Sequence, residues 1–62
     1  MVSYKVVTKR YAEVEFDFRN FRVHSYGDVE RWDGESWKWL DETDEDYEFV
    51  REEGLKALEE TK

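Results

Sequence analysis

The chain has 62 residues, of which 17 are acidic and 10 are basic, so its formal net charge is −7. A chain of this length forms a single small domain, residues 1–62, which buries only about 60% of its unfolded surface and leaves no room for a multi-step enzyme with a deep pocket. The absence of cysteine excludes disulfides and thiolate metal sites. No long apolar run and no signal-peptide pattern is visible, so we expect a cytoplasmic protein without a membrane segment.

The charge divides the chain at residue 40. Residues 1–40 contain seven acidic and seven basic side chains and are neutral as a segment. Residues 41–62 contain ten acidic side chains against three basic ones, so this segment carries the whole excess of negative charge. Such a shift is compatible with a disordered acidic tail, but the apolar periodicity of residues 41–62 predicts a helix instead.

The first forty residues are expected to form strands. Residues 12–19 alternate between apolar and charged side chains, and residues 2–6 alternate in the same way, which is typical of half-buried antiparallel strands. A turn at residues 9–11 separates the two segments, unless they form one long bent strand. After residue 18 the apolar positions change from even to odd numbers, which predicts a turn or bulge at Arg19–Asn20.

Two three-residue loops, each ending in glycine, are predicted next: Ser25-Tyr26-Gly27 and Trp32-Asp33-Gly34. They would place apolar residues opposite one another on one face of the sheet, namely Val23 with Val29 and Val29 with Trp37. On the other face they would pair Arg22 with Glu30, His24 with Asp28, and Asp28 with Lys38. The competing two-residue turn at Asp33-Gly34 would set Val29 against Lys38, so the pairing favours the longer loop.

Residues 41–62 are predicted to form an acidic amphipathic helix, capped at its start by Thr43 or Asp44. One stripe of this helix is apolar or small, and it comprises Tyr47, Val50, Gly54, Ala57 and Leu58, with Leu55 on its flank. Gly54 costs about 1 kcal/mol of helix stability relative to alanine, or it permits a close approach to the sheet.

The predicted fold class is α+β, with a four- or five-stranded antiparallel β-meander followed by one C-terminal helix packed on it. The sequence does not choose between an open sheet and one curled towards a small barrel. The predicted core comprises Tyr4, Val6, Val14, Phe16, Phe18, Phe21, Val23, Val29, Trp37, Tyr47, Val50 and Leu58. Trp39 is also expected to point inward by its parity.

No motif for catalysis, cofactor binding or metal binding is found. The chain has no glycine-rich phosphate loop, no Gly-x-Ser-x-Gly sequence and no cysteine nucleophile. The single histidine, His24, is expected in an ordinary cross-strand pair beside Asp28. The acidic run at residues 41–48 lacks the central glycine of a calcium loop. We therefore expect a protein that is not an enzyme and has no cofactor and no metal site.

Two binding functions remain. The favoured one is an interaction module, an inhibitor or an adaptor, that binds a basic protein through the outer arc of the helix. The partner-binding residues would be Phe49 as an anchor with Glu45, Glu48, Glu52 and Glu53 around it. The alternative is a purely structural role for Phe49, in which its ring folds back onto the rim of the sheet.

The alternative function is binding of single-stranded nucleic acid on an arginine- and aromatic-rich sheet surface. Its residues would be Arg19, Arg22, Arg31, Tyr26 and Trp32. The net charge opposes it, because a charge of −7 repels a polyanion. A homodimer is a further expectation, because a meander has two open edges. The abundance of Glu, Lys and Arg is compatible with a thermophilic source.

Overall fold

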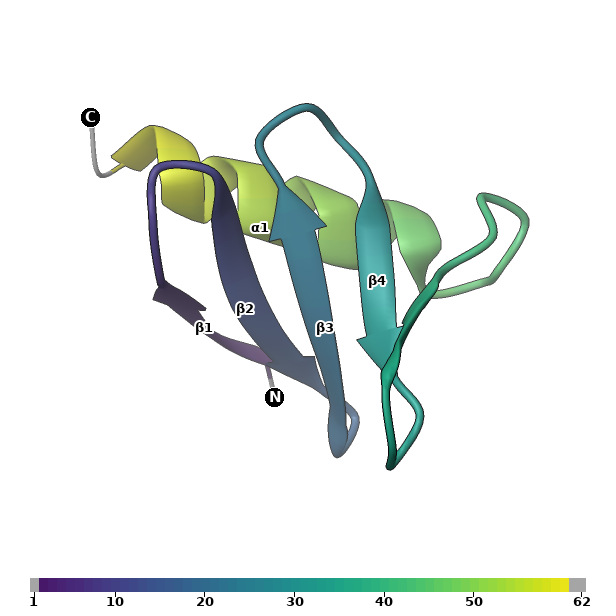
Figure 1. Cartoon of the computed structure of the whole chain (residues 1–62). Helices are drawn as coiled ribbons and strands as arrows, with labels where there is room; N and C mark the ends of the chain where they lie inside the picture. The colour runs from purple at the N-terminus through teal and green to yellow at the C-terminus, as the bar shows by residue number, and fades with distance from the viewer. Residues whose placement is uncertain (1, 61–62) are drawn as a thin grey trace.

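The computed structural model describes residues 2–60, which form five strands and one helix. Their bounds are β1 (Val2–Val6), β2 (Tyr11–Phe16), β3 (Arg19–His24), β4 (Val29–Trp32), β5 (Trp37–Trp39) and α1 (Tyr47–Glu60). The strands pair antiparallel in the order β1-β2-β3-β4-β5, and the sheet does not close into a barrel (Figure 1). The predicted fold class is therefore confirmed, and the open sheet is the form that is found.

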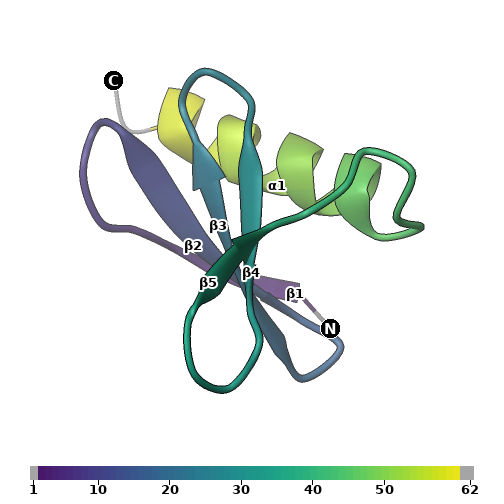
Figure 2. The same cartoon turned by 45° about the vertical axis from the view of Figure 1, so that its right-hand side comes forward.

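The helix α1 lies across one face of the sheet and contacts β1, β2, β3 and β4 (Figure 2). The core lies between these two layers. Its buried apolar side chains are Ala12, Val14, Phe21, Val23, Val29, Val50, Ala57 and Leu58. The predicted apolar stripe of the helix is confirmed, because its buried residues are Val50, Gly54, Ala57 and Leu58.

The connection between β3 and β4 is the predicted three-residue loop. The N–H of Gly27 donates to the carbonyl of His24 at 2.9 Å, and the N–H of His24 donates to the carbonyl of Asp28 at 2.8 Å. Gly27 adopts a φ of +102°, which a side chain would disfavour. Val23 lies opposite Val29, as the loop length requires.

The turn between β2 and β3 lies at Asp17–Phe18, so the prediction of a turn at Arg19–Asn20 was wrong. Phe16 pairs with Arg19, which leaves only two residues in the turn. Both adopt a positive φ, +54° for Asp17 and +61° for Phe18, as a hairpin turn of type I′ requires. Phe18 is 98% exposed, so its prediction as a core residue was also wrong.

The connection between β4 and β5 differs from both predicted turns, because it spans residues 33–36. The carboxylate of Asp33 organises it by accepting the N–H of Glu35 at 2.8 Å and that of Ser36 at 2.9 Å. Gly34 has the positive φ of +104° that was expected of it, but it stands second in the loop instead of last.

This longer loop shifts the register of β5 and turns two tryptophans over. Trp37 lies opposite Trp32, and Trp39 lies opposite Glu30. Both rings therefore share the sheet face that points away from α1, because alternate residues of a strand point to opposite faces. The predictions of Trp37 in the core and of Trp39 pointing inward were wrong for this reason. Tyr4 is on the helix side but remains 48% exposed, with its hydroxyl donating to Glu60.

The helix begins later than predicted. The N–H of Val50 donates to the carbonyl of Asp46 at 3.0 Å, so Asp46 occupies the N-cap position and Tyr47 is the first helical residue. Thr43 and Asp44 instead belong to the preceding turns, where the carboxylate of Asp44 accepts the N–H of Asp46 at 2.9 Å.

Gly54 lies directly against the sheet. A Cβ atom built on it would overlap the side chain of Val23, and even the farthest of the three nearest carbons, Cγ1, would lie only 2.7 Å away. The helix therefore approaches β3 at a distance that only glycine permits, which confirms the second explanation for this residue.

Two aspartates in the loops are expected to titrate below their ordinary pKa of 3.8. The N–H groups of Ser36 and Glu35 lower the pKa of Asp33, and the hydroxyl and N–H of Thr43 lower that of Asp41. Because folding favours the charged form, the stability they contribute is present above pH 3.8 and is lost as the pH falls through the lowered pKa values. An NMR titration of the side-chain carboxyl carbons checks this, and midpoints at or above 3.8 would contradict it.

Candidate binding surfaces

The outer surface of α1 and of the turn before it forms the first candidate surface, which we call the acidic face. It contains Glu45, Glu48, Glu52 and Glu53 together with Glu59 and Glu60. All are exposed except Glu53, which is partly exposed. Among residues 2–60, none of the three recorded ion pairs involves a carboxylate of this face. These carboxylates therefore form no ion pair within the described part of the chain, and Lys56 is the one basic side chain of α1 that lies among them.

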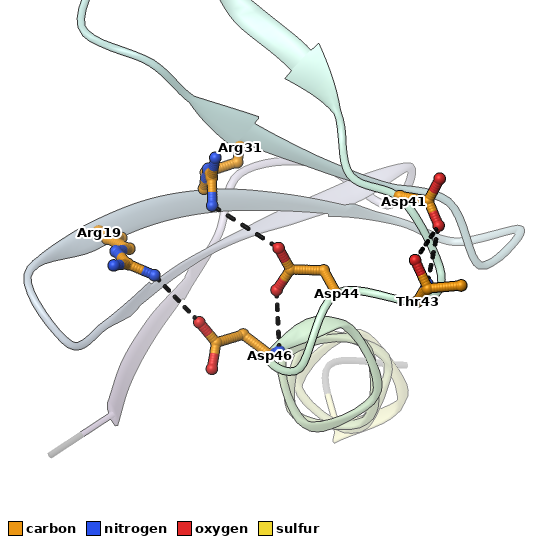
Figure 3. A network of polar contacts seen from close by, with 6 residues as sticks. All are labelled: Arg19, Arg31, Asp41, Thr43, Asp44 and Asp46. Carbon is orange, nitrogen blue, oxygen red and sulfur yellow. Dashed lines mark hydrogen bonds and ion pairs between the residues drawn. The ribbon is translucent and has the colours of Figure 1, made fainter.

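Two other carboxylates before the helix are neutralised by the sheet (Figure 3). Nη1 of Arg19 lies 3.3 Å from Oδ2 of Asp46, and Nη1 of Arg31 lies 3.8 Å from Oδ2 of Asp44. Both arginines thus contact the segment that leads into α1. The structure does not bring them together with the other three residues of the predicted nucleic-acid surface.

Phe49 packs on the rim of the sheet, as the structural alternative for this residue predicted. Its ring centroid lies 4.8 Å from that of Phe16, with the planes inclined at 46°. The side chain is still 41% exposed, so part of its ring remains available beside Glu45, Glu48 and Glu52.

An open groove of about 600 Å³ adjoins the start of the acidic face. It runs between the β3–β4 loop and the first turn of α1, and its lining includes Tyr26, Asp28, Glu42, Tyr47, Glu48 and Arg51. The guanidinium Nε of Arg51 donates to the carbonyl of Gly27 at 3.0 Å, which fixes this cation against the loop. Three carboxylates and two tyrosine rings therefore line a groove that holds a single basic side chain.

The second candidate surface is the sheet face directed away from α1, which we call the open face. By strand parity it comprises Ser3, Lys5, Tyr11, Glu13, Glu15, Asn20, Arg22, His24, Glu30, Trp32, Trp37 and Trp39. The ring of Tyr26, from the β3–β4 loop, joins it by stacking on His24 at 5.3 Å. The sequence pattern did not predict Trp37 and Trp39 as members of this surface, because both were expected to point inward.

Arg22 lies among the rings of the open face. Its guanidinium carbon is 4.1 Å from the ring centroid of Trp37 and 5.0 Å from that of Tyr11, so it makes cation–π contacts with both. Its Nε is buried and has no hydrogen-bond partner. The predicted pairing of Arg22 with Glu30 is confirmed at the level of the backbone register. The carboxylate of Glu30, however, contacts a different side chain.

The carboxylate of Glu30 contacts the imidazole of His24. Its Nε2 lies 2.6 Å from Oε1 of Glu30, and both side chains are mostly buried, with 17% and 15% exposed. The predicted side-chain pair of His24 with Asp28 is therefore wrong. His24 instead contacts Glu30, its diagonal neighbour on β4. The rings of Tyr11 and Trp39 lie 5.8 Å from the imidazole, so His24 sits within the aromatic cluster.

Within residues 2–60, no three histidine or carboxylate side chains are grouped closely enough to hold a metal ion. No helix in the same range is long and apolar enough to cross a membrane. Comparison with known proteins finds no family model, no curated protein and no solved structure that matches this chain.

Proposed function

We propose that this protein is a non-enzymatic interaction domain that binds a basic protein partner through its acidic face, as an inhibitor or an adaptor. The observation that supports it is that the carboxylates of this face have no cationic partner within residues 2–60, whereas Asp44 and Asp46 do. Carboxylates gathered on one side of a domain attract a basic surface and raise its rate of association.

The groove at the start of the helix supplies the short-range part of this proposal. An arginine or lysine of the partner would find carboxylates from Asp28, Glu42 and Glu48 there, together with the rings of Tyr26 and Tyr47. Carboxylates and aromatic faces both attract a cation, and the tyrosines also cover its aliphatic stem. The exposed part of Phe49 offers a separate apolar contact on the opposite flank of the same helical turn, where its ring lies against Phe16.

A charge-reversal experiment tests this proposal with a fluorescently labelled arginine-rich peptide as the probe. The variant Glu48→Lys/Glu52→Lys is expected to bind the peptide at least about 10-fold more weakly at low salt, because it reverses the sign at the centre of the acidic face. The measurement is fluorescence anisotropy across a salt series.

The matched control is Glu15→Lys/Glu35→Lys, which changes the net charge by the same amount on exposed residues outside the acidic face. It is expected to weaken binding by less than about 3-fold, because charges on the far side are screened beyond about 10 Å. Equal losses in the two variants would show a response to net charge alone, and the acidic face would then be rejected as the site.

A second candidate function is the binding of single-stranded nucleic acid on the open face. The observation that favours it is the guanidinium of Arg22 placed on the rings of Trp37 and Tyr11, because stacking rings beside an arginine suit a single strand. Against it, Arg19 and Arg31 are engaged in ion pairs with the segment before α1, and Glu13 and Glu15 lie on the open face itself.

Labelled oligothymidylate, titrated at several salt concentrations, tests the second candidate. Binding through the open face is expected to quench the fluorescence of the three tryptophans, all of which lie on β4 and β5. Arg22→Gln is expected to weaken it, while Arg10→Gln, in the loop after β1, removes one charge elsewhere. An absence of binding at low salt would reject this function.

A further inference from the structure

We propose that a second copy of this chain packs on the open face, about a two-fold axis that runs along the strands between β2 and β3. The first observation is the amount of ring surface left on this face. The exposed fraction is 68% for Tyr26, 64% for Trp39 and 39% for Trp32. Because α1 covers the opposite face, no element of residues 2–60 shields these rings from water.

The second observation is a row of charges across the open face. The registers place Lys5 opposite Glu13, Glu13 opposite Arg22, and Arg22 opposite Glu30. The row therefore reads positive, negative, positive, negative from β1 to β4. Within the chain, neighbouring members attract one another, but the order also has a consequence for a second copy.

A two-fold axis in the plane of the face, parallel to the strands and midway between β2 and β3, reverses this row. Lys5 of one copy then approaches Glu30 of the other, whose carboxylate also contacts His24, and Glu13 approaches Arg22, which already lies on two rings. The strands that overlap about this axis are β1–β4, so Trp37 and Trp39 on β5 border the contact. Since an isologous contact repeats each pair, the row forms four attractive pairs and no repulsive one. An axis placed on β3 would instead set Arg22 against its own copy, so the charges select the position of the axis.

The neighbouring rows agree with the same axis. On one side, Tyr11 of β2 would meet His24 of β3, which brings a ring against an imidazole. On the other side, Glu15 would meet Asn20, a carboxylate against a neutral amide that can donate to it. Like charges oppose one another in none of these rows.

The acidic face does not obstruct this assembly. Each α1 would lie on the outside of a helix–sheet–sheet–helix sandwich, and packed sheets alone are separated by about 10 Å, which is the Debye length in ordinary buffer. The net charge of each copy is therefore directed away from the contact. The glutamates of α1 remain free to bind a partner, and the dimer does not depend on the proposed function. The ring of Tyr26, however, belongs both to the open face and to the groove beside the acidic face, so the two contacts would share this residue.

The size of the molecule suits a stable interface. A standard contact removes about 800 Å² from each partner. The accessible surface of the molecule is 4735 Å², and it measures 29 × 21 × 21 Å, so one side of it supplies about a sixth of that surface. The open face is one such side.

Sedimentation equilibrium from micromolar to millimolar concentration tests the proposal on the purified protein. The wild type is expected to show a dimer of twice 7.6 kDa. Glu13→Arg and Arg22→Glu are each expected to raise the dimer dissociation constant at least about 100-fold, because each places two like-charged pairs in the contact. An equimolar mixture of the two variants is expected to form a dimer again. In that mixed dimer the new arginine of the first variant meets the new glutamate of the second, and Arg22 of the first meets Glu13 of the second.

Lys5→Glu provides a second variant that leaves the ring contacts of Arg22 intact, and it is expected to weaken the dimer in the same direction. Its matched control is Lys9→Glu, an exposed charge in the loop after β1, which is expected to leave the dissociation constant within about 3-fold. Far-UV circular dichroism confirms that each variant is folded before association is compared.

Three results would overturn the proposal. A wild type that stays at 7.6 kDa at millimolar concentration has no such dimer. A dimer unaffected by Glu13→Arg and Lys5→Glu uses another surface, such as the exposed edge of β1 or β5. A monomer whose tryptophan fluorescence is quenched by oligothymidylate assigns the open face to nucleic acid. In each case the peptide-binding experiment on the acidic face can still succeed or fail separately.

Discussion

Replacing Gly54 by alanine is expected to lower the free energy of unfolding by about 2 kcal/mol or more, although alanine is the better helix former by about 1 kcal/mol. The added methyl group would overlap the side chain of Val23, whose β-branched carbons cannot turn away within β3. The helix would have to move off the sheet, which opens the core around Val14 and Val50.

Denaturant unfolding monitored by tryptophan fluorescence measures this effect. Glu52→Ala, at an exposed position of the same helix, is the control and is expected to change stability by less than about 0.5 kcal/mol. Val23→Gly removes the side chain that the new methyl group of Gly54→Ala would overlap. The double variant is therefore expected to be more stable than the sum of the two single effects predicts. A more stable Gly54→Ala protein would show that α1 stands farther from β3.

Two phenylalanines three residues apart are expected to respond in opposite directions. Phe21 is fully buried in the core, so Phe21→Ala is expected to cost about 3–5 kcal/mol, which is most of the stability of a small domain. Phe18 is 98% exposed and has a φ of +61°, so its ring contributes no burial while its backbone is strained. Phe18→Gly is expected to stabilise the protein by about 1 kcal/mol.

Thermal unfolding followed by circular dichroism distinguishes these effects. A gain of about 1 kcal/mol raises Tm by about 4–8 °C in a domain of this size. Phe18→Ala serves as the control, because it removes the ring but keeps a side chain at the strained position, and it is expected to change Tm little. A lower Tm for Phe18→Gly would mean that the aromatic ring at the turn stabilises the folded chain.

Local patterns in the sequence are sufficient to predict most of the fold. The alternation from Ala12 to Phe16 corresponds to β2, and the glycine-ended loop at residues 25–27 sets the register of β3 with β4. The apolar stripe on the helix is the one that is buried. These features depend on residues close together in the chain, where the period of a strand or helix acts directly on the side chains.

The errors arise at two turns whose bounds are not set by the position of a glycine. Phe18 adopts a positive φ that glycine or asparagine would favour, so its identity conceals the turn, although Asp17 is a residue that such turns accept. At residues 33–36 the Asp33 carboxylate accepts two backbone N–H groups and lengthens the loop. Because a strand has a period of two, a loop that changes the register by an odd number of residues turns every later side chain over.

The two candidate surfaces also differ in whether local sequence patterns are sufficient to predict them. The acidic face could be predicted, because it depends only on the helical period. The open face could not, because its membership depends on the register of β5, which brings Trp37 and Trp39 next to Arg22 and His24. The ion pairs of Arg19 and Arg31 with the segment before α1 were likewise invisible, because they join residues far apart in the sequence.

The packing of α1 on a strictly sequential meander determines the order in which contacts can form. Each strand pairs with the next through a short connection, so the hairpins close over small loops and form on a microsecond timescale. The contacts of the helix instead join distant residues, such as Gly54 with Val23 and Tyr4 with Glu60. Docking of α1 is therefore expected to be the late step that completes the core, and Gly54→Ala should accelerate unfolding more than it slows hairpin formation.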